Sequence, residues 1–249
     1  MINIRSAREI ELLRKSAQLV VAALKLAESR IRPGLRTKDL DEEIGDFIRS
    51  HGARPAFKGF NGYPANICVS IDEQVVHGIP GDRVIKEGEI VSVDIGVELN
   101  GYYGDAAKTF AVGKVSEEKE RLIRVTRESL EKAIEAAREG NRISDIGYAV
   151  QSHVEGAGFS VVRDLVGHGI GTSMHEPPQV PNYGRPGHGV RLRAGMVLAI
   201  EPMVNAGTYQ VYTADDNWTV VTMDGKPSAH FEHDIVITKG DPDILTSGL

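Results

Sequence analysis

Two segments near the start of the chain repeat apolar residues at three- and four-residue spacing, the pattern of an amphipathic helix. The first covers about residues 10–31, follows a capping box formed by Ser6 and Glu9, and stops at Pro33-Gly34. The second covers about residues 37–50, with apolar positions on one side of the expected helix. The pattern therefore predicts two consecutive helices at the amino-terminal end.

The next part of the chain changes to short apolar runs that are typical of β-strands. These runs cover residues 67–71, 90–97 and 102–112. Helical spacing returns from Ser116 to about residue 138, with three glutamates in the first turn where the helix dipole favours acids, and again over 144–155. The remainder is mostly strand-like and glycine-rich. Helices and strands in this order predict an α+β protein.

The chain also contains an internal similarity. Residues 32–52 align with 138–158 at a displacement of 106, and residues 84–94 align with 191–201 at a displacement of 107. Chance similarity between amphipathic helices explains the first match alone, but it explains both matches poorly. We expect two related halves that leave a cleft between them.

The second match places Asp94 at the position of Glu201. It divides the chain into halves of about 1–115 and 116–249, which we expect to form a single catalytic domain spanning 1–249. An acidic residue from each half would then face the cleft.

Composition limits the class of protein. The 249 residues are 41% hydrophobic and 26% charged, which is ordinary for a globular chain, and the net charge of −6 gives no reason to expect nucleic-acid binding. One local group of basic side chains could form a positive patch, although a solvated loop is the simpler interpretation. This group consists of Arg185, His188, Arg191 and Arg193.

Cysteine usage and the amino-terminal segment bear on location. Cys68 is the only cysteine, so no disulfide can form within the chain, as is usual in a reducing compartment. The first residues become charged at once without an apolar signal region, and no stretch approaches 18 apolar residues. We therefore expect a cytoplasmic protein that does not enter a membrane.

The segment DIGVELNGYYGD predicts a hairpin that carries two carboxylates. Asn100-Gly101 between two strand-like runs is typical of a two-residue turn. Counting outward from that turn places Asp94 opposite Ala107, with Asp105 two positions away on the same face. Both carboxylates would then reach a shared ion, provided that no bulge shifts the register.

Further acids occupy apolar segments. Glu201 lies in MVLAIEPM and Glu232 in HFEHDIVIT, just as Asp94 lies in IVSVDIGV. A buried carboxylate is costly unless it is paired or binds a cation. Separate salt bridges are the alternative interpretation, but these segments contain no lysine or arginine to form them. Divalent cations would remove the repulsion between the acids.

Three histidines lie in turn-like segments beside glycine or proline: His77, His168 and His175. A single histidine in such a place is more often a surface or core residue than a ligand. Together with the acids, however, they form an oxygen-rich ligand set that suits Mn, Fe(II) or Co better than structural zinc. A pair of such ions activates water, so the predicted reaction is metal-assisted amide hydrolysis.

At these residues the sequence resembles the type I methionine aminopeptidases, whose fold is the pita-bread fold. The resemblance extends over the whole chain and is carried by five motifs. These are NGYPANICVSIDEQVVHGIP, VSVDIGVELNGYYGDAAKTF, GHGIGTSMHEPPQVPNYG, MVLAIEPMVNAG and HFEHDIVIT.

The resemblance implies two divalent metal ions and five ligands. Asp105 and Glu232 would bridge both ions, Asp94 would hold one, and His168 with Glu201 would hold the other. Glu201 would also transfer a proton from the attacking water to the leaving amine.

The resemblance also implies how substrate binds. His175 would stabilise the oxyanion, and His77 would hydrogen-bond the substrate backbone. A methionine pocket would be lined by Phe57, Phe60, Tyr63, Cys68, Met174, Met203 and Trp218. Phe57 and Met174 depart from the usual pattern of the family, which concerns the shape of the pocket and not the reaction.

By this resemblance the protein would remove the first methionine from nascent chains when the second residue is small, acting as a monomer with transient ribosome contact. One alternative is a proline-directed enzyme of the same fold, although such enzymes usually carry an additional amino-terminal domain. Another is a non-catalytic module that binds polypeptides, although such modules typically lose ligand residues, and here all five are present.

Overall fold

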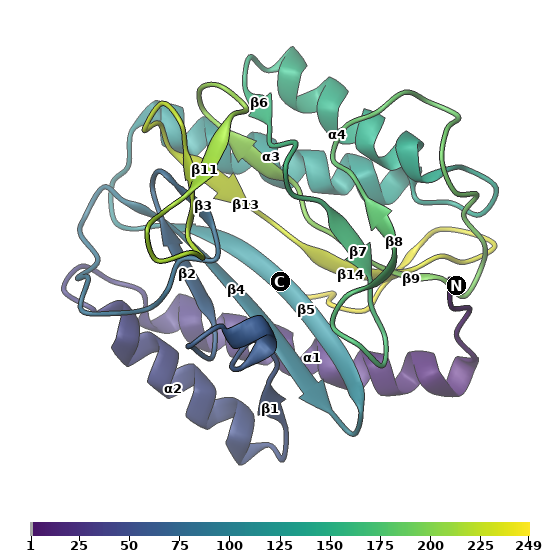
Figure 1. Cartoon of the computed structure of the whole chain (residues 1–249), viewed down its shortest axis with the longest axis horizontal. Helices are drawn as coiled ribbons and strands as arrows, with labels where there is room; N and C mark the ends of the chain where they lie inside the picture. The colour runs from purple at the N-terminus through teal and green to yellow at the C-terminus, as the bar shows by residue number, and fades with distance from the viewer. Residues whose placement is uncertain (1) are drawn as a thin grey trace.

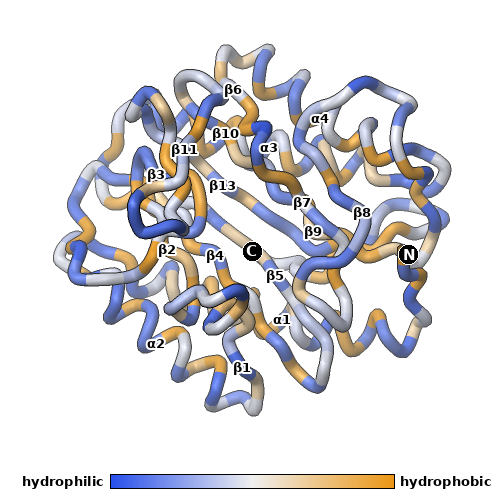
Figure 2. Tube along the Cα trace, viewed as in Figure 1, coloured by the Kyte–Doolittle hydropathy of each residue, from blue (hydrophilic) through white to orange (hydrophobic). Residues whose placement is uncertain are grey.

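The structure, a computed structural model, describes residues 2–249. Four α-helices lie where the hydrophobic pattern predicts them, with ends shifted by no more than a few residues. They are α1 (Ala7–Arg30), α2 (Thr37–Ser50), α3 (Glu117–Ala136) and α4 (Ile143–Gly156). The alternation of polar and apolar positions is visible along α1 and α2 in Figure 2. No helix among residues 2–249 is long and apolar enough to cross a membrane.

Local signals fix where α1 begins. The Ser6 hydroxyl accepts a hydrogen bond from the backbone N–H of Glu9, and the Glu9 carboxylate accepts one from the backbone N–H of Ser6 at 2.9 Å. This reciprocal capping box satisfies two backbone donors that a helix start otherwise leaves free. The predicted start of α1 is therefore confirmed at atomic detail.

The strands form four antiparallel sheets. They are β1 (Arg54–Pro55), β2 (Cys68–Ile71), β3 (Gln74–Val76), β4 (Ile90–Leu99), β5 (Tyr102–Ala111), β6 (Ser160–Val161), β7 (Gly167–Gly169), β8 (Glu176–Val180), β9 (Val197–Ile200), β10 (Met203–Asn205), β11 (Val211–Thr213), β12 (Val220–Thr222), β13 (Ser228–His230), β14 (His233–Val236) and β15 (Asp243–Ile244), with a short 3-10 helix η1 at Phe60–Gly62. The strand orders are β1-β4-β2 with β5 paired to β4, β13-β10-β6, β11-β12-β3, and β15-β14-β9-β7-β8.

The β4–β5 hairpin has the predicted register. Asp94 pairs with Ala107 across the hairpin, and no bulge interrupts the ladder from its open end to the turn. Asn100 and Gly101 have φ values of 55° and 82°, as a two-residue turn with two left-handed residues requires. Asp94 and Asp105 therefore share one face of the hairpin, as the sequence predicted.

Two helix pairs enclose the strands, with α1 and α2 on one side and α3 and α4 on the other (Figure 1). One core joins α1 and α2 to β2 and β4, and a second joins α3 and α4 to β9 and β10. The helices α2 and α4 correspond at a displacement of 106 residues, and β4 and β9 begin at residues 90 and 197, at a displacement of 107. The two sequence matches therefore coincide with equivalent secondary structure.

The basic group expected to be either a patch or a solvated loop lies on an exposed segment between β8 and β9. Arg185, His188, Arg191 and Arg193 are all exposed. The His188 backbone carbonyl accepts a hydrogen bond from the Ser144 hydroxyl at 2.6 Å, which holds this segment against the start of α4. This placement agrees with the simpler interpretation of a solvated loop.

Candidate metal centre and substrate cavity

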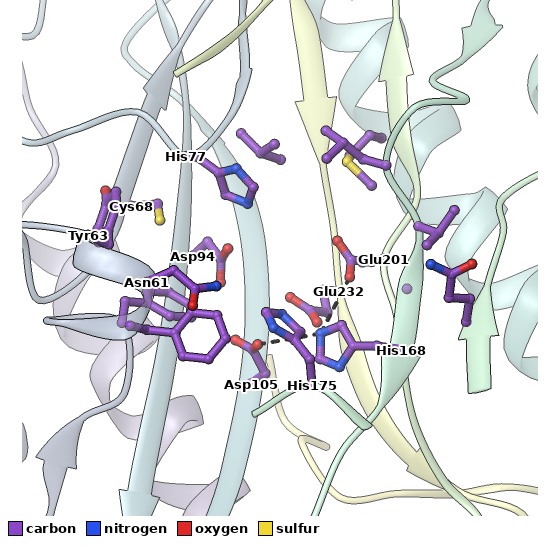
Figure 3. A pocket seen from close by; sticks show the side chains of 18 of the residues that line it. Asn61, Tyr63, Cys68, His77, Asp94, Asp105, His168, His175, Glu201 and Glu232 are labelled. Carbon is purple, nitrogen blue, oxygen red and sulfur yellow. Dashed lines mark ion pairs between the residues drawn. The ribbon is translucent and has the colours of Figure 1, made fainter. Parts of the chain in front are cut away.

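A cavity of about 570 Å³ lies between the two helix pairs, and acids enter it from both sides. Figure 3 shows Asp94 and Asp105, from the β4–β5 hairpin, facing Glu201 and Glu232, which lie beside β9 and β14. His168, from β7, lies on the same side as these two glutamates. All five side chains that the resemblance implies as metal ligands line this one cavity.

Three of the five come close enough together to share one ion. Ligand atoms of Asp105, His168 and Glu232 all lie within 4.8 Å of one another. The Nε2 atom of His168 is 3.6 Å from Glu201 Oε1 and 4.0 Å from Asp105 Oδ2. The structure therefore brings an imidazole and two or more carboxylates to a common centre.

The orientation of His168 suits a ligand. Its Nδ1 lies 2.9 Å from the backbone carbonyl of Gly169, which can only accept, so Nδ1 carries the hydrogen and Nε2 presents its lone pair to the acids. Burial lowers the pKa of His168 to about 3, because the charged imidazolium would lose its hydration. A neutral imidazole with a fixed tautomer is the form that binds a metal.

Several carboxylate oxygens in the cavity are buried without a hydrogen-bond partner. Asp94 Oδ1, Asp105 Oδ1 and Glu232 Oε1 all belong to this group. No lysine or arginine among residues 2–249 forms an ion pair with these acids or with Glu201. Burying an unpaired carboxylate oxygen costs free energy unless a cation coordinates it.

Burial also changes the protonation of these acids. Loss of hydration raises the pKa of Asp94 to about 7 and that of Glu201 to about 8. It raises the pKa of Asp105 and Glu232 well above the ordinary range, and the neighbouring carboxylates add to this effect. Four carboxylates are thus crowded together with no positive side chain to balance them. The donor set fits divalent cations that prefer oxygen and imidazole ligands.

These shifts predict how the stability of the cation-free protein changes with pH. In the unfolded chain the four carboxyls lose their protons near pH 4, whereas in the folded protein they keep them to about pH 7–8 or above. Buried histidines such as His77 and His168 oppose this effect at lower pH, because their lowered pKa leaves them neutral in the folded protein while they are still charged in the unfolded chain. Above about pH 7 they are neutral in both states, so the folded state binds more protons and the free energy of unfolding decreases as pH rises. We expect the melting temperature in EDTA to fall by about 10 °C between pH 7 and pH 8.5.

Calorimetry with and without saturating Mn²⁺ checks this expectation. The cation should abolish most of the decline, because it takes the place of the protons. A melting temperature in EDTA that is constant or increases over this range would contradict the description of the acidic cluster.

Two further histidines face the cavity. The ring of His175 meets that of His168 at a centroid distance of 4.2 Å and lies 5.1 Å from the ring of Phe60. His77 has a left-handed backbone conformation with φ of 59°, which is rare for a non-glycine residue and is often associated with functional sites. Burial lowers the pKa of His77 to about 4, which keeps its imidazole neutral near pH 7.

Apolar and aromatic side chains form the wall beside the acids. Of the residues expected in the methionine pocket, six line the cavity: Phe57, Phe60, Tyr63, Cys68, Met203 and Trp218. The hydroxyl of Tyr63 is held by the backbone carbonyls of Ile67 and Gly78, and its ring packs edge-on against Trp218 at 5.1 Å. These contacts hold the Tyr63 ring in place within the apolar wall.

Met174 is the exception among the expected pocket residues. It does not line the cavity, because its side chain is 2% exposed and turns toward Gly96 on β4. A Cβ atom at Gly96 would collide with Met174 Cε and would lie 2.7 Å from Phe57 Cε1. Met174 and Phe57 occupy the space that a side chain at Gly96 would fill. Met174 therefore lies behind the residues that line the cavity.

Two buried residues that the sequence interpretation missed also belong to the centre. The Nε2 atom of His230 lies 3.7 Å from Glu201 Oε2 and has no hydrogen-bond partner. The Asp234 carboxylate accepts a hydrogen bond from the backbone N–H of Asp105 at 2.8 Å, which ties β14 to β5. Both residues flank Glu232 in the same apolar motif, and this proximity was the available signal.

Comparisons with known proteins agree with this geometry. Residues 11–239 match the model of metallopeptidase family M24. A methionine aminopeptidase of Clostridium perfringens is 54% identical over 246 residues, which is 99% of both chains. The crystal structure of a methionine aminopeptidase from Thermotoga maritima has a TM-score of 0.97 at 48% identity and covers 99% of each chain.

Proline-directed enzymes share the fold at a greater distance. A prolidase from Pyrococcus horikoshii has a TM-score of 0.79 at 23% identity, and this chain covers 63% of its length. The α+β architecture is thus that of the pita-bread enzymes, as the resemblance predicted. The family match, the identity over the full length and the arrangement of acids around one cavity agree, and the chain belongs to the methionine aminopeptidases of metallopeptidase family M24.

Proposed function

We propose that this protein hydrolyses the first peptide bond of new polypeptides and releases methionine when the second residue is small. The observation that carries the proposal is the joint composition of the cavity, with a carboxylate cluster beside a wall of aromatic and sulfur-containing side chains. The cluster supplies the hydrolytic centre. The wall suits the flexible and polarizable side chain of methionine.

Two divalent ions, Mn, Fe(II) or Co, are the proposed cofactors. Asp105 and Glu232 would contact both ions, Asp94 would hold one of them, and His168 with Glu201 would hold the other. Support comes from the unpartnered oxygens of Asp94, Asp105 and Glu232, and from the free Nε2 of His168. When bound, the ions supply an activated water and neutralise charge that develops during amide hydrolysis.

Three side chains would transfer the proton, stabilise the oxyanion and bind the substrate backbone. Glu201, which lines the cavity at the end of β9, would take up a proton from the attacking water and deliver it to the leaving amine. His175 donates a hydrogen bond to the carbonyl oxygen as its negative charge grows. His77 lies on the opposite side of the cavity in Figure 3 and binds the substrate backbone beside the bond to be cut.

The methionine side chain would bind against Tyr63, Cys68 and Trp218, with Phe57, Phe60 and Met203 completing the pocket. Burial raises the pKa of the Cys68 thiol well above its ordinary value, so this side chain serves as an apolar surface and not as a nucleophile. We infer that Met174 contributes indirectly, by supporting Phe57 from behind.

We infer further that residues 1–249 form a single catalytic domain of two related halves, 1–115 and 116–249. Support comes from the nearly equal displacements of α2 to α4 and of β4 to β9, 106 and 107 residues, and from acids that reach the cavity from both sides. The proposed partner is the amino terminus of a nascent chain in the cytoplasm, with the enzyme acting as a monomer and touching the ribosome transiently.

Peptide hydrolysis tests the proposed reaction. Release of methionine from Met-Ala-Ser, in anaerobic buffer with Mn²⁺, Fe²⁺ or Co²⁺ added, is the expected result. Met-Leu-Ser should be cleaved at least ~10²-fold more slowly, because a large second side chain does not fit. Cleavage confined to bonds that precede proline would contradict the proposal and would favour a proline-directed enzyme of the same fold.

A further inference from the structure

An ion pair joins the amino-terminal segment to the turn that carries His175. The Nη2 atom of Arg5 lies 2.6 Å from Glu176 Oε1 and 2.5 Å from Glu176 Oε2. Each of the two side chains is only 8% exposed, so water does not screen this pair as it screens surface pairs. Asn3 adds a hydrogen bond to Glu176 at 2.7 Å from the same segment.

Glu176 holds the turn that precedes it. Its Oε1 accepts hydrogen bonds from the backbone N–H of Thr172 at 2.9 Å and of Ser173 at 3.2 Å. One carboxylate thus accepts hydrogen bonds from two backbone N–H groups of residues 171–176 and also forms the ion pair with Arg5. The two residues between these donors and Glu176 are Met174 and His175.

Arg5 is itself fixed in place. Its backbone N–H donates to the carbonyl of Gly195 at 2.8 Å, and its side chain reaches Glu9 in the first turn of α1 at 3.4 Å. A Cβ atom at Gly171 would collide with the Arg5 guanidinium, so the turn and the arginine are packed together without space. The amino-terminal segment therefore acts as a fixed anchor for this turn.

We propose that Arg5 is a positioning residue for His175: its ion pair with Glu176 holds the turn 171–176 so that the His175 imidazole faces the carboxylate cluster. His175 depends on this support, because it occupies an exposed position of the turn, where its ring packs against the rings of Phe60 and His168. The inference rests on the proposed role of His175 as a donor to the substrate carbonyl. A donor displaced by about 1 Å loses much of its effect in the transition state.

The test replaces Arg5 in the full-length, metal-loaded enzyme. Arg5→Met should lower kcat for Met-Ala-Ser by about 10- to 100-fold while KM changes by less than about threefold. Arg5→Lys should retain at least about a third of the wild-type kcat, because a single arginine nitrogen contacts both oxygens and a lysine ammonium can replace it.

A control substitution removes an ion pair of α1, the helix that begins two residues after Arg5. Arg14 binds Asp243 at 2.5 Å and joins α1 to β15, and this pair includes no residue of the turn 171–176. Arg14→Met should leave kcat within about twofold of wild type. If Arg14→Met and Arg5→Met lower kcat equally, loosening of α1 explains both effects and the inference is wrong.

A double substitution separates positioning from general structural damage. In a His175→Ala background, Arg5→Met should change kcat by less than about twofold, because the group that Arg5 positions is gone. If the double variant loses kcat by the product of the two single losses, Arg5 acts independently of His175. That result would overturn the inference while leaving the proposed role of His175 intact. If His175→Ala alone leaves kcat unchanged, the proposed role of His175 fails, and the inference fails with it.

Amide hydrogen exchange gives a readout that does not depend on activity. The amides of Thr172 and Ser173 should exchange at least ~10-fold faster in Arg5→Met than in wild type or in Arg14→Met, because their acceptor loses its anchor. Equal exchange in all three proteins would show that Arg5 does not hold the turn and would contradict the inference.

Discussion

Replacing Glu232 by glutamine is expected to lower kcat/KM for Met-Ala-Ser by at least ~10³-fold and to remove at least one divalent cation per chain. The substitution preserves size and shape, but it replaces an anionic oxygen with an amide. Glu232 is 2% exposed and its Oε1 has no hydrogen-bond partner among the described residues, as expected of an oxygen that binds a cation. Metal analysis after equilibrium dialysis, together with steady-state kinetics, measures both effects.

A neighbouring substitution controls for the loss of a buried charge. Asp234 is also buried, lies two residues further along the chain and has one oxygen, Oδ1, without a partner, while its Oδ2 accepts a backbone hydrogen bond from Asp105. Unlike Glu232 it does not line the cavity, and we propose no cation contact for it. Asp234→Asn can keep that hydrogen bond through its amide oxygen and should keep its bound cations. Full activity of Glu232→Gln would be incompatible with a carboxylate shared by two ions.

Replacing His175 by alanine is the second large effect that we expect, a decrease of about 10²–10³-fold in kcat with the cation content unchanged. The His175 ring lies beside His168, at 4.2 Å between centroids, and beside Phe60 of the apolar wall, at 5.1 Å. We propose that in this position it contacts substrate and does not hold the metal.

Metal content and kinetics of the same preparation distinguish these two roles. His175→Gln keeps a hydrogen-bond donor at this position and should recover part of the lost kcat. If His175→Ala binds fewer cations than the wild type, then His175 is a ligand and its proposed role is wrong.

The hairpin shows how far local sequence can predict the site. Asn100-Gly101 allows one favoured turn, and that turn fixes the register of ten residue pairs in the structure. The shared face of Asp94 and Asp105 follows from this register and from the twofold alternation of a strand. The four helices were equally predictable, because their signals, such as the Ser6–Glu9 capping box, lie within a few residues.

Other features depend on contacts between distant parts of the chain. The pairing of Arg5 with Glu176 joins residues 171 positions apart, and nothing near either residue indicates the other. Met174 turned away from the cavity because Gly96, on another strand, leaves room for it. The strands of the second half are only two to five residues long, so their hydrophobic pattern was too short to give bounds.

The acidic cluster lies between these two cases. Each carboxylate could be recognised singly, as an acid in an apolar run without a nearby lysine or arginine. Their convergence was expected from the internal similarity, which placed Asp94 and Glu201 at equivalent positions, from the register of the hairpin and from the resemblance. His230 and Asp234 received no role in the sequence analysis, because nothing in the motif HFEHDIVIT distinguishes them as buried groups beside Glu232.

Equilibrium dialysis of the EDTA-treated protein against Mn²⁺ under anaerobic conditions, with methionine release measured on the same samples, tests the central claim most directly. The claim is that the buried carboxylates are held together by divalent cations. It predicts about two bound ions per chain at saturation and activity that rises with occupancy. A folded protein that binds no divalent ion, even at excess, would contradict it.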